Sequence, residues 1–89
     1  MSDWKLVRTA TFLEHLKRFR RDGEFWKALD KKLTRLRQDP ESVGGMLSGE
    51  LHGKKSTRLL RTLRLIFRID VQAHAVILEA IDHRKGVYD

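Results

Sequence analysis

Apolar and polar residues alternate over residues 4–9, which is the period of a half-buried β-strand. From Thr9 or Thr11, either of which can cap a helix, apolar residues recur at helical spacing. These residues are Phe12, Leu13, Leu16 and Phe19. The pattern therefore predicts a strand followed by a first helix, which the Asp22-Gly23 pair ends.

A second helical pattern begins at Gly23 or Glu24. Its apolar stripe consists of Phe25, Trp26, Leu29, Leu33 and Leu36. Asp39 ends this helix, because the residue before a proline is pushed out of the α region. The connection between the two helices is short, so we expect an antiparallel hairpin whose apolar stripes face one side. Trp4 and Trp26 are expected to pack in the core or between helix and sheet.

Periodicity breaks down over residues 41–55, where we expect a packed, irregular loop anchored by Met46, Leu47 and Leu51. Three strand-like runs follow, at residues 57–61, 63–69 and 75–81. The second run alternates, and the third is almost entirely apolar, which is typical of a strand inside a sheet. Short turns between the runs favour an antiparallel meander.

The predicted order of elements is βααβββ. This is an α+β fold in which the helix hairpin covers one face of a small, mainly antiparallel sheet. A chain of 89 residues supports one hydrophobic core, and no boundary divides it. We therefore expect residues 1–89 to form a single domain.

The composition excludes several classes of protein. There is no cysteine, so neither a disulfide framework nor a thiolate zinc site can form, and the four histidines lack the spacing of a metal site. No apolar run reaches the roughly 18 residues that span a bilayer, and no secretory signal pattern opens the chain. We expect a cytoplasmic protein with no membrane association, no metal and no small-molecule cofactor.

Charge adds a candidate function, since 19 Lys and Arg against 12 Asp and Glu give a net charge of +7. Between residues 53 and 68 there are six basic residues and no acid: Lys54, Lys55, Arg58, Arg61, Arg64 and Arg68. Strand alternation places Arg64 and Arg68 on one face, opposite the apolar residues. Arg58 and Arg61 differ in parity, so only one of them can join that face without a bulge.

Two interpretations of this basic segment remain open. It can be a solvated sheet face that keeps a small protein soluble. It can instead bind the backbone of RNA or DNA, which would offset the repulsion between cations on neighbouring strands and would weaken steeply with salt. The basic residues of the second helix are interspersed with acids and indicate an ordinary solvated face.

A second group of candidate residues follows the last strand. His83 can exchange a proton near neutral pH, Arg84 can donate two hydrogen bonds to a phosphate, and Tyr88 can stack on a base or donate a proton. Asp82 could instead make His83 a structural hydrogen-bond partner. Neither interpretation is decided by these residues alone.

Three segments together resemble a known family. Residues 47–53 read LSGELHG, residues 63–70 read LRLIFRID, and residues 81–88 read IDHRKGVY. They resemble the L-x-G, "yRliYri" and "GHRxxVY" patterns of the RelE/ParE toxin superfamily of bacterial toxin–antitoxin systems. The resemblance covers nearly the whole chain and implies a RelE-like fold. Relatives of the RelE and YoeB type are ribosome-dependent endoribonucleases that cut mRNA and are bound by a small antitoxin.

The resemblance implies a toxin of a type II system that cleaves mRNA on the ribosome without a metal, with a cognate acidic antitoxin as partner. Arg64 and Arg84 match arginines that stabilise the scissile phosphate, Tyr88 matches a tyrosine that orients the nucleotide, and His83 matches a position suited to a proton shuttle. The basic strand and loop, which supply a general base in some relatives and would bind RNA here, correspond to Lys54, Lys55, Arg58, Arg61 and Arg68.

Two other functions are compatible with the same fold. One is a ParE-like inhibitor of DNA gyrase without nuclease activity, and the other is a catalytically degenerate domain that binds RNA or its antitoxin. The sequence departs from the family pattern at Leu63, Phe67 and Asp82. Replacing Arg64 by alanine distinguishes the nuclease from the gyrase inhibitor, since it should abolish mRNA cleavage and leave gyrase inhibition mostly intact.

Overall fold

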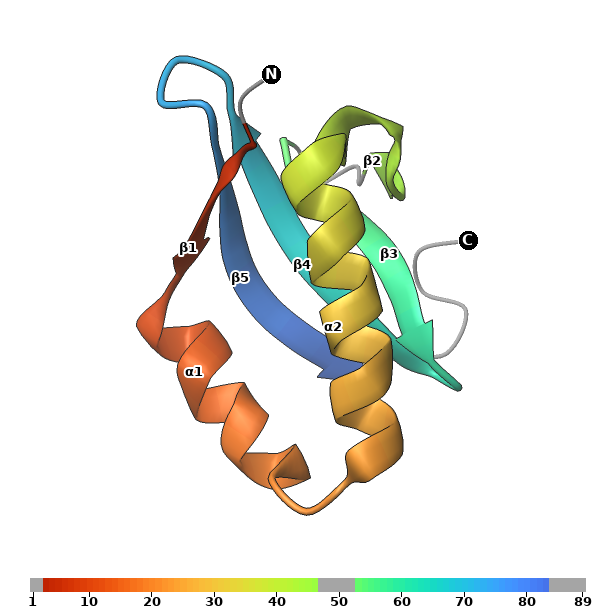
Figure 1. The fold of residues 1–89 in the computed structure, drawn as a ribbon. Coiled ribbons are helices and arrows are strands. Elements are labelled where there is room, and N and C mark those ends of the chain that lie inside the picture. Colours follow the sequence, from red (N-terminus) through yellow and green to blue (C-terminus); the bar gives the residue numbers. More distant parts are fainter. Residues whose placement is uncertain (1–2, 47–52, 84–89) are drawn as a thin grey trace.

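The computed structural model describes residues 3–46 and 53–83. The elements are β1 (Lys5–Arg8), α1 (Ala10–Leu16), η1 (Lys17–Phe19), α2 (Gly23–Gln38), η2 (Pro40–Ser42), β2 (Gly45–Met46), β3 (Lys55–Leu60), β4 (Leu63–Asp70) and β5 (Ala75–His83). The predicted α+β fold is confirmed, because α1 and α2 pack on one face of a mixed sheet (Figure 1). No helix within the described residues is both long and apolar enough to cross a membrane.

The sheet has five strands in the order β1-β5-β4-β3-β2. Strands β3, β4 and β5 form the predicted antiparallel meander, and β1 pairs in parallel with β5. The short outer strand β2 lies where an irregular loop was predicted, and Met46 is exposed instead of anchoring it. At Gly44, which has a φ of +70°, a Cβ would lie 2.3 Å from the carbonyl oxygen of Ser56, so only glycine fits there.

Thr9, one of two predicted capping residues, and Asp22, predicted only to end the first helix, cap the two helices. The Thr9 hydroxyl accepts the amide proton of Phe12 at 3.1 Å and begins α1. The Asp22 carboxylate does the same for Phe25 at 3.1 Å and begins α2. The chain leaves α2 at Asp39, before the proline, as predicted.

Two apolar residues of the predicted helix stripes are not in the core. Leu13 is 47% exposed and Trp26 is 38% exposed, so both predictions were wrong. Trp26 lies at the flank of α2, where its ring contacts Phe25 edge-on and its Nε1–H donates to the carbonyl of Phe19 at 2.8 Å. An indole needs an acceptor for this N–H, and the flank provides one.

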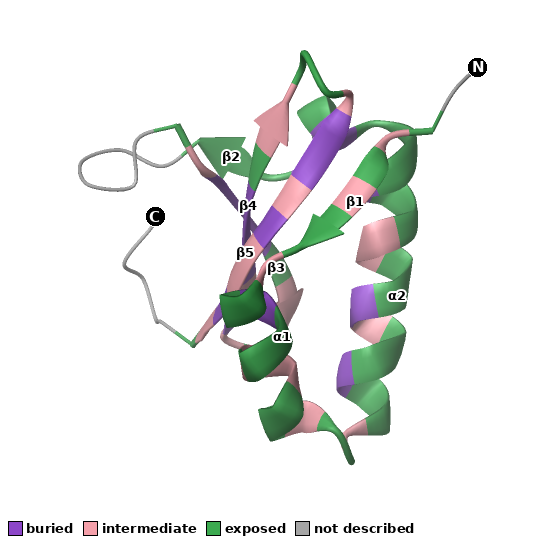
Figure 2. Ribbon diagram, turned by 90° about the vertical axis from the view of Figure 1, so that its left-hand side faces the viewer, coloured by how far each residue is buried: buried purple, intermediate pink, exposed green. Residues whose placement is uncertain are grey.

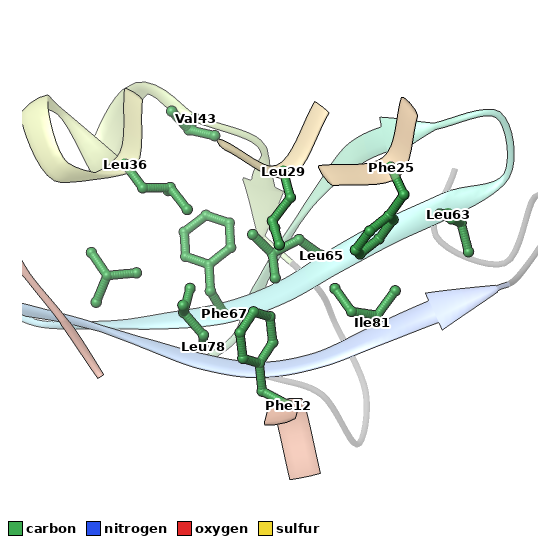
Figure 3. Packing of buried hydrophobic residues seen from close by; sticks show 11 residues of the cluster. Phe12, Phe25, Leu29, Leu36, Val43, Leu63, Leu65, Phe67, Leu78 and Ile81 are labelled. Atoms are coloured by element: carbon green, nitrogen blue, oxygen red, sulfur yellow. The ribbon is translucent and has the colours of Figure 1, made fainter. Parts of the chain in front are cut away.

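The hydrophobic core fills the space between the two helices and the sheet (Figures 2 and 3). Its buried residues are Phe12, Phe25, Leu29, Leu36, Val43, Leu63, Leu65, Phe67, Val76, Leu78 and Ile81. Because strand residues alternate between faces, burial of Leu63, Leu65 and Phe67 turns their neighbours Arg64 and Arg68 away from the helices. We call this side of the sheet, which no described helix covers, the far face.

Candidate nucleic-acid interface

A row of charged residues crosses the far face. Arg58 on β3 lies opposite Arg64 on β4, and Arg64 lies opposite Asp82 on β5. Directly opposite residues of antiparallel strands share a face, so Arg58 is the arginine that joins Arg64. The Arg64 Nε–H donates to the Ser56 hydroxyl at 2.9 Å, and Ser56 is itself buried. A fixed side chain therefore orients the guanidinium of Arg64.

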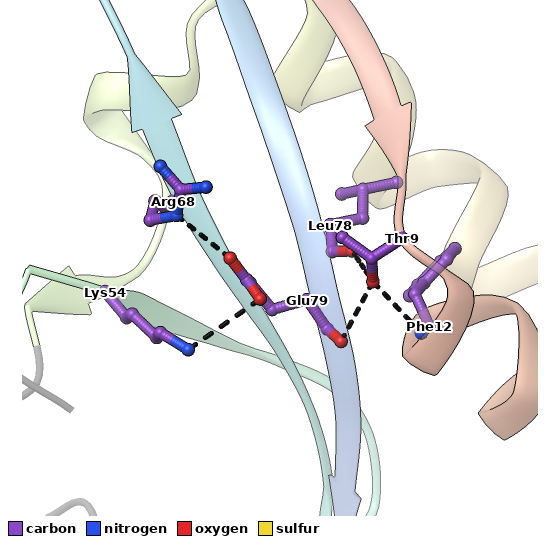
Figure 4. A network of polar contacts seen from close by, with 6 residues as sticks. All are labelled: Thr9, Phe12, Lys54, Arg68, Leu78 and Glu79. Carbon is purple, nitrogen blue, oxygen red and sulfur yellow. Dashed lines mark hydrogen bonds and ion pairs between the residues drawn. The ribbon is translucent and has the colours of Figure 1, made fainter. Parts of the chain in front are cut away.

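A second cluster lies farther along the same face, beyond Ile66 of β4, and is drawn in Figure 4. The Glu79 carboxylate accepts a hydrogen bond from the Arg68 Nε–H at 2.9 Å, and its other oxygen lies 3.7 Å from the Lys54 ammonium. Two carboxylates of β5, those of Glu79 and Asp82, thus lie among the cations of β3 and β4. The far face therefore carries less net positive charge than residues 53–68 alone indicate, but its described cations still outnumber its acids.

Arg61 does not belong to this face. It lies in the turn between β3 and β4 with a φ of +52°, after a register shift between Arg58 and Leu60. Its guanidinium contacts the carboxylate of Glu24 on α2 at 3.1 Å. The turn therefore directs Arg61 toward the helix side of the sheet.

Lys55 has a structural contact in place of an exposed ammonium. The side chain is buried, and its Nζ donates to the carbonyl oxygens of Pro40 at 3.3 Å and Glu41 at 2.9 Å. The ammonium also lies 5.8 Å from the centre of the Phe67 ring. These contacts join β3 to η2 and leave Lys55 unsuited to contact RNA or to act as a base, in contrast with its neighbour Lys54.

His83 is not brought to the face of Arg64. It pairs with Leu63, a core residue, so the strand alternation directs its Cβ to the helix side, where the residue is exposed. Arg84 and Tyr88 lie outside the described residues, as does the segment 47–52. Of the four candidate catalytic residues, the structure therefore positions Arg64 and His83, on opposite faces at one end of the sheet.

The remaining described histidines have structural partners. His15 on α1 accepts the amide proton of Ile81 through Nδ1 at 3.0 Å, and the His74 ring stacks on Trp4 at 4.0 Å between centroids. The described residues contain no group of side chains suited to hold a metal ion. Glu79 and Ser56 were not identified from the sequence, because their contact with the arginines depends on strand register.

No protein-family model and no curated protein matches the chain. Solved structures do match it. The RelBE2 toxin–antitoxin complex of Mycobacterium tuberculosis contains a chain with a TM-score of 0.70 and 28% identity, covering 92% of this chain and 99% of that one. A YoeB/ParE toxin from Agrobacterium tumefaciens gives a TM-score of 0.79 at 18% identity, covering 91% and 99%. YafQ from E. coli gives 0.76 at 11% identity, covering 97% and 99%.

The chain has the fold of the RelE/YoeB-like toxin superfamily and is similar to its solved structures. This confirms the family resemblance seen in the sequence. Within this fold the far face combines an oriented arginine, Arg64, with an adjacent Arg58 whose side chain makes no ion pair with the described residues. Such a pair of guanidinium groups can bind a phosphate and stabilise charge that develops on its oxygens.

A basic groove lies on the other side of the sheet. It has a volume of about 960 Å³ and runs between α2 and Leu59 of β3. Its cations are Lys27, Lys31, Lys32 and Arg35, and its one acid is Asp30. Burial, with the nearby Arg35 cation as a second cause, lowers the pKa of Lys32 from its usual value. None of the four cations forms an ion pair within the described part of the chain.

Proposed function

We propose that this chain is the toxin of a type II toxin–antitoxin system and that it cleaves mRNA on the ribosome as a metal-independent endoribonuclease. The observation that carries the proposal is the geometry of Arg64, which Ser56 orients on the far face beside Arg58. The similarity to RelE2, YoeB and YafQ structures supports a toxin, and the basic far face supports a polyanionic substrate.

The proposed reaction uses the RNA as its own nucleophile. The 2′-hydroxyl oxygen forms a bond to the adjacent phosphorus while the bond from phosphorus to the 5′ oxygen breaks. A base takes the proton of the 2′-hydroxyl, and an acid protonates the departing 5′ oxygen, which leaves a 2′,3′-cyclic phosphate and a 5′-hydroxyl. Arg64 stabilises the charge on the phosphoryl oxygens in this step.

The remaining roles follow from the family resemblance. Arg84 adds a second phosphate-side cation, and Tyr88 orients the nucleotide. His83 or Lys54 transfers the proton, since Lys55 is committed to backbone carbonyls. Arg58, Arg68 and Lys54 bind the RNA backbone on the far face.

Primer extension on a defined mRNA in a cell-free translation reaction tests this function. We expect wild-type protein to produce new cuts at codons occupied by the ribosome. Arg64→Ala should lower the cleavage rate by about 10²- to 10³-fold, the usual loss when one pre-organised charge donor is removed. Arg61→Ala is the matched control, because that arginine pairs with Glu24 off the far face, and its rate should stay close to that of the wild type.

Undiminished cleavage by Arg64→Ala would contradict the proposed role of this residue. Intact mRNA and unaffected translation with the wild type would contradict the nuclease itself. A gyrase inhibitor is the second candidate, favoured by the placement of His83 away from Arg64 and by the acids of β5 on the far face. A DNA supercoiling assay on wild type and Arg64→Ala would then decide.

We further propose that the partner is an antitoxin with an acidic segment, and that this segment binds the groove beside α2. The similar solved structure from M. tuberculosis is a toxin–antitoxin complex. Four cations line the groove without described ion pairs, so Asp and Glu side chains complement it. Beyond its two residues paired with β2, the outer edge of β3 has no described strand partner and can accept an extended segment.

A further inference from the structure

One carboxylate reaches the far face because of an irregularity in β5. Ile66 pairs with Ala80, and Phe67 pairs with Leu78. Glu79 is therefore an extra residue that has no partner on β4, which is a β-bulge. With strict alternation from Ala80, the side chain at position 79 would point toward the helices. The bulge instead delivers Glu79 to the far face.

A hydroxyl from the start of α1 holds the backbone of this bulge (Figure 4). The Thr9 side chain donates to the carbonyl oxygen of Leu78 at 2.8 Å and lies 3.3 Å from that of Glu79. The same hydroxyl oxygen accepts the amide proton of Phe12. The bulge is thus tied to a helix cap, and the direction of the Glu79 side chain is set by the fold.

The Glu79 carboxylate uses one oxygen for each of two cations. Oε2 accepts the Arg68 Nε–H at 2.9 Å, and Oε1 lies 3.7 Å from Lys54 Nζ (Figure 4). The side chains are 22% exposed for Glu79, 33% for Lys54 and 47% for Arg68, so a ligand in solution can reach the cluster. A carboxylate held between two accessible cations occupies the position in which a phosphate would be bound.

We propose that Glu79 is an internal counterion, and that a phosphate of the RNA replaces its carboxylate between Lys54 and Arg68 when the far face binds RNA. This inference rests on the proposed function. Carboxylate and phosphate both offer two oxygens to paired cations, so one can take the place of the other. Partly exposed ion pairs are weak, and the exchange is therefore reversible.

The internal counterion has two opposite effects. In the free protein it reduces the repulsion between Lys54 and Arg68, which lie on adjacent parts of the sheet. In the complex it competes with RNA, and its displaced charge repels the backbone. Glu79 therefore lowers the affinity for RNA without contacting the scissile bond, and it limits binding of RNA away from the ribosome.

Equilibrium binding of a short, fluorescein-labelled single-stranded RNA tests the inference. Glu79→Gln should bind about two- to fivefold more tightly than the wild type at low salt, the factor expected from loss of one exposed ion pair. The slope of log affinity against log salt should be the same for both proteins, because in each complex one phosphate is bound between Lys54 and Arg68. Glu24→Gln is the matched control, because it removes the same charge from an exposed arginine pair on α2.

Equal affinity of Glu79→Gln and Glu24→Gln for RNA would overturn the inference. So would weaker binding by Glu79→Gln, or absence of RNA binding by the wild type and both variants. Thermal unfolding verifies that each variant is folded, and Glu79→Ala provides a second variant without the carboxylate, for which we expect the same tightening. Cleavage of mRNA is measured separately. Wild-type protein that cuts mRNA while Glu79→Gln binds no more tightly would overturn this inference alone.

Discussion

Two adjacent lysines, Lys54 just before β3 and Lys55 at its start, have different surroundings. Consecutive strand residues point to opposite faces, so Lys54 reaches the far face while Lys55 enters the helix side. There its ammonium donates to two carbonyl oxygens of η2, those of Pro40 and Glu41. Lys54 is thus available to bind a ligand on the far face, whereas Lys55 stabilises the fold.

Replacing Lys55 by methionine should therefore affect stability. Methionine preserves the apolar stem but removes the charged donor, and hydrogen bonds to charged groups contribute about 1.5 to 3 kcal/mol. We expect a decrease in Tm of about 10 °C, since each kcal/mol corresponds to about 4 to 8 °C in a domain of this size. Differential scanning calorimetry of Lys55→Met and Lys54→Met measures it, the second variant losing only a partly exposed ion pair. Equal melting temperatures of the two would contradict a structural role for Lys55.

At this scale the sequence predicted which arginines share a face and missed what they contact. The alternation in β4 was sufficient to place Arg64 and Arg68 together, and it left open whether Arg58 or Arg61 joins them. Strand parity alone does not reveal the acids of β5, because the bulge at Glu79 reverses the alternation. Strand parity also does not reveal the turn with positive φ at Arg61, which places this side chain in contact with Glu24.

Among the elements, α1 protects the part of β5 that β1 leaves uncovered. β1 pairs with β5 only over residues 75–78. Beyond that, the Thr9 hydroxyl donates to the carbonyls of Leu78 and Glu79, and His15 accepts the amide proton of Ile81. A short helix therefore completes the edge of a strand whose parallel partner ends early.

Thr9→Val tests this connection, because valine keeps the shape of threonine and removes its hydroxyl. The variant loses a helix cap and a donor to β5, and we expect the free energy of unfolding to fall by about 1 to 3 kcal/mol. Urea unfolding measures the change as a lower midpoint at an unchanged slope. Thr34→Val is the control, since the Thr34 hydroxyl donates only to the Asp30 carbonyl on the exposed surface of α2. A midpoint for Thr9→Val equal to that of Thr34→Val would show that the connection does not stabilise the fold.

Element boundaries were largely predictable because caps and breakers are local signals. Thr9, Asp22 and Pro40 mark the helix ends in the sequence as they do in the structure. The strand β2 was missed because two residues carry no periodicity, and its pairing depends on the close approach of Gly44 to Ser56. Tertiary contact, not local pattern, creates this strand.

Across the whole molecule, positive charge is divided between two sides of the sheet. The far face presents Arg58, Arg64 and Arg68. The cations of the groove lie beside α2, which covers the opposite face of the sheet (Figure 1). A net charge of +7 therefore supports two binding surfaces, not one. An RNA on the far face and an acidic protein segment in the groove would not compete for the same side chains.

Because the two surfaces are separate, substitutions in the groove should weaken binding of the antitoxin and leave mRNA cleavage unchanged. Lys31→Glu combined with Lys32→Glu reverses the charge in the groove, where like charges across an interface are strongly unfavourable. We expect its affinity for the cognate antitoxin to fall by at least about tenfold, measured by titration calorimetry at low salt. Cleavage of mRNA should stay near the wild-type rate, since both lysines lie on α2, across the sheet from Arg64.

Lys17→Glu is the control for this pair of substitutions, because the Lys17 side chain is exposed on η1 and forms an exposed ion pair with Glu14. It should bind the antitoxin almost as well as the wild type does. In cells, the double variant should arrest growth even when the antitoxin is co-expressed, whereas Lys17→Glu should be neutralised. Unchanged antitoxin binding by the double variant would place the partner elsewhere. Loss of cleavage together with binding, in a protein that remains folded, would mean that the two surfaces are coupled.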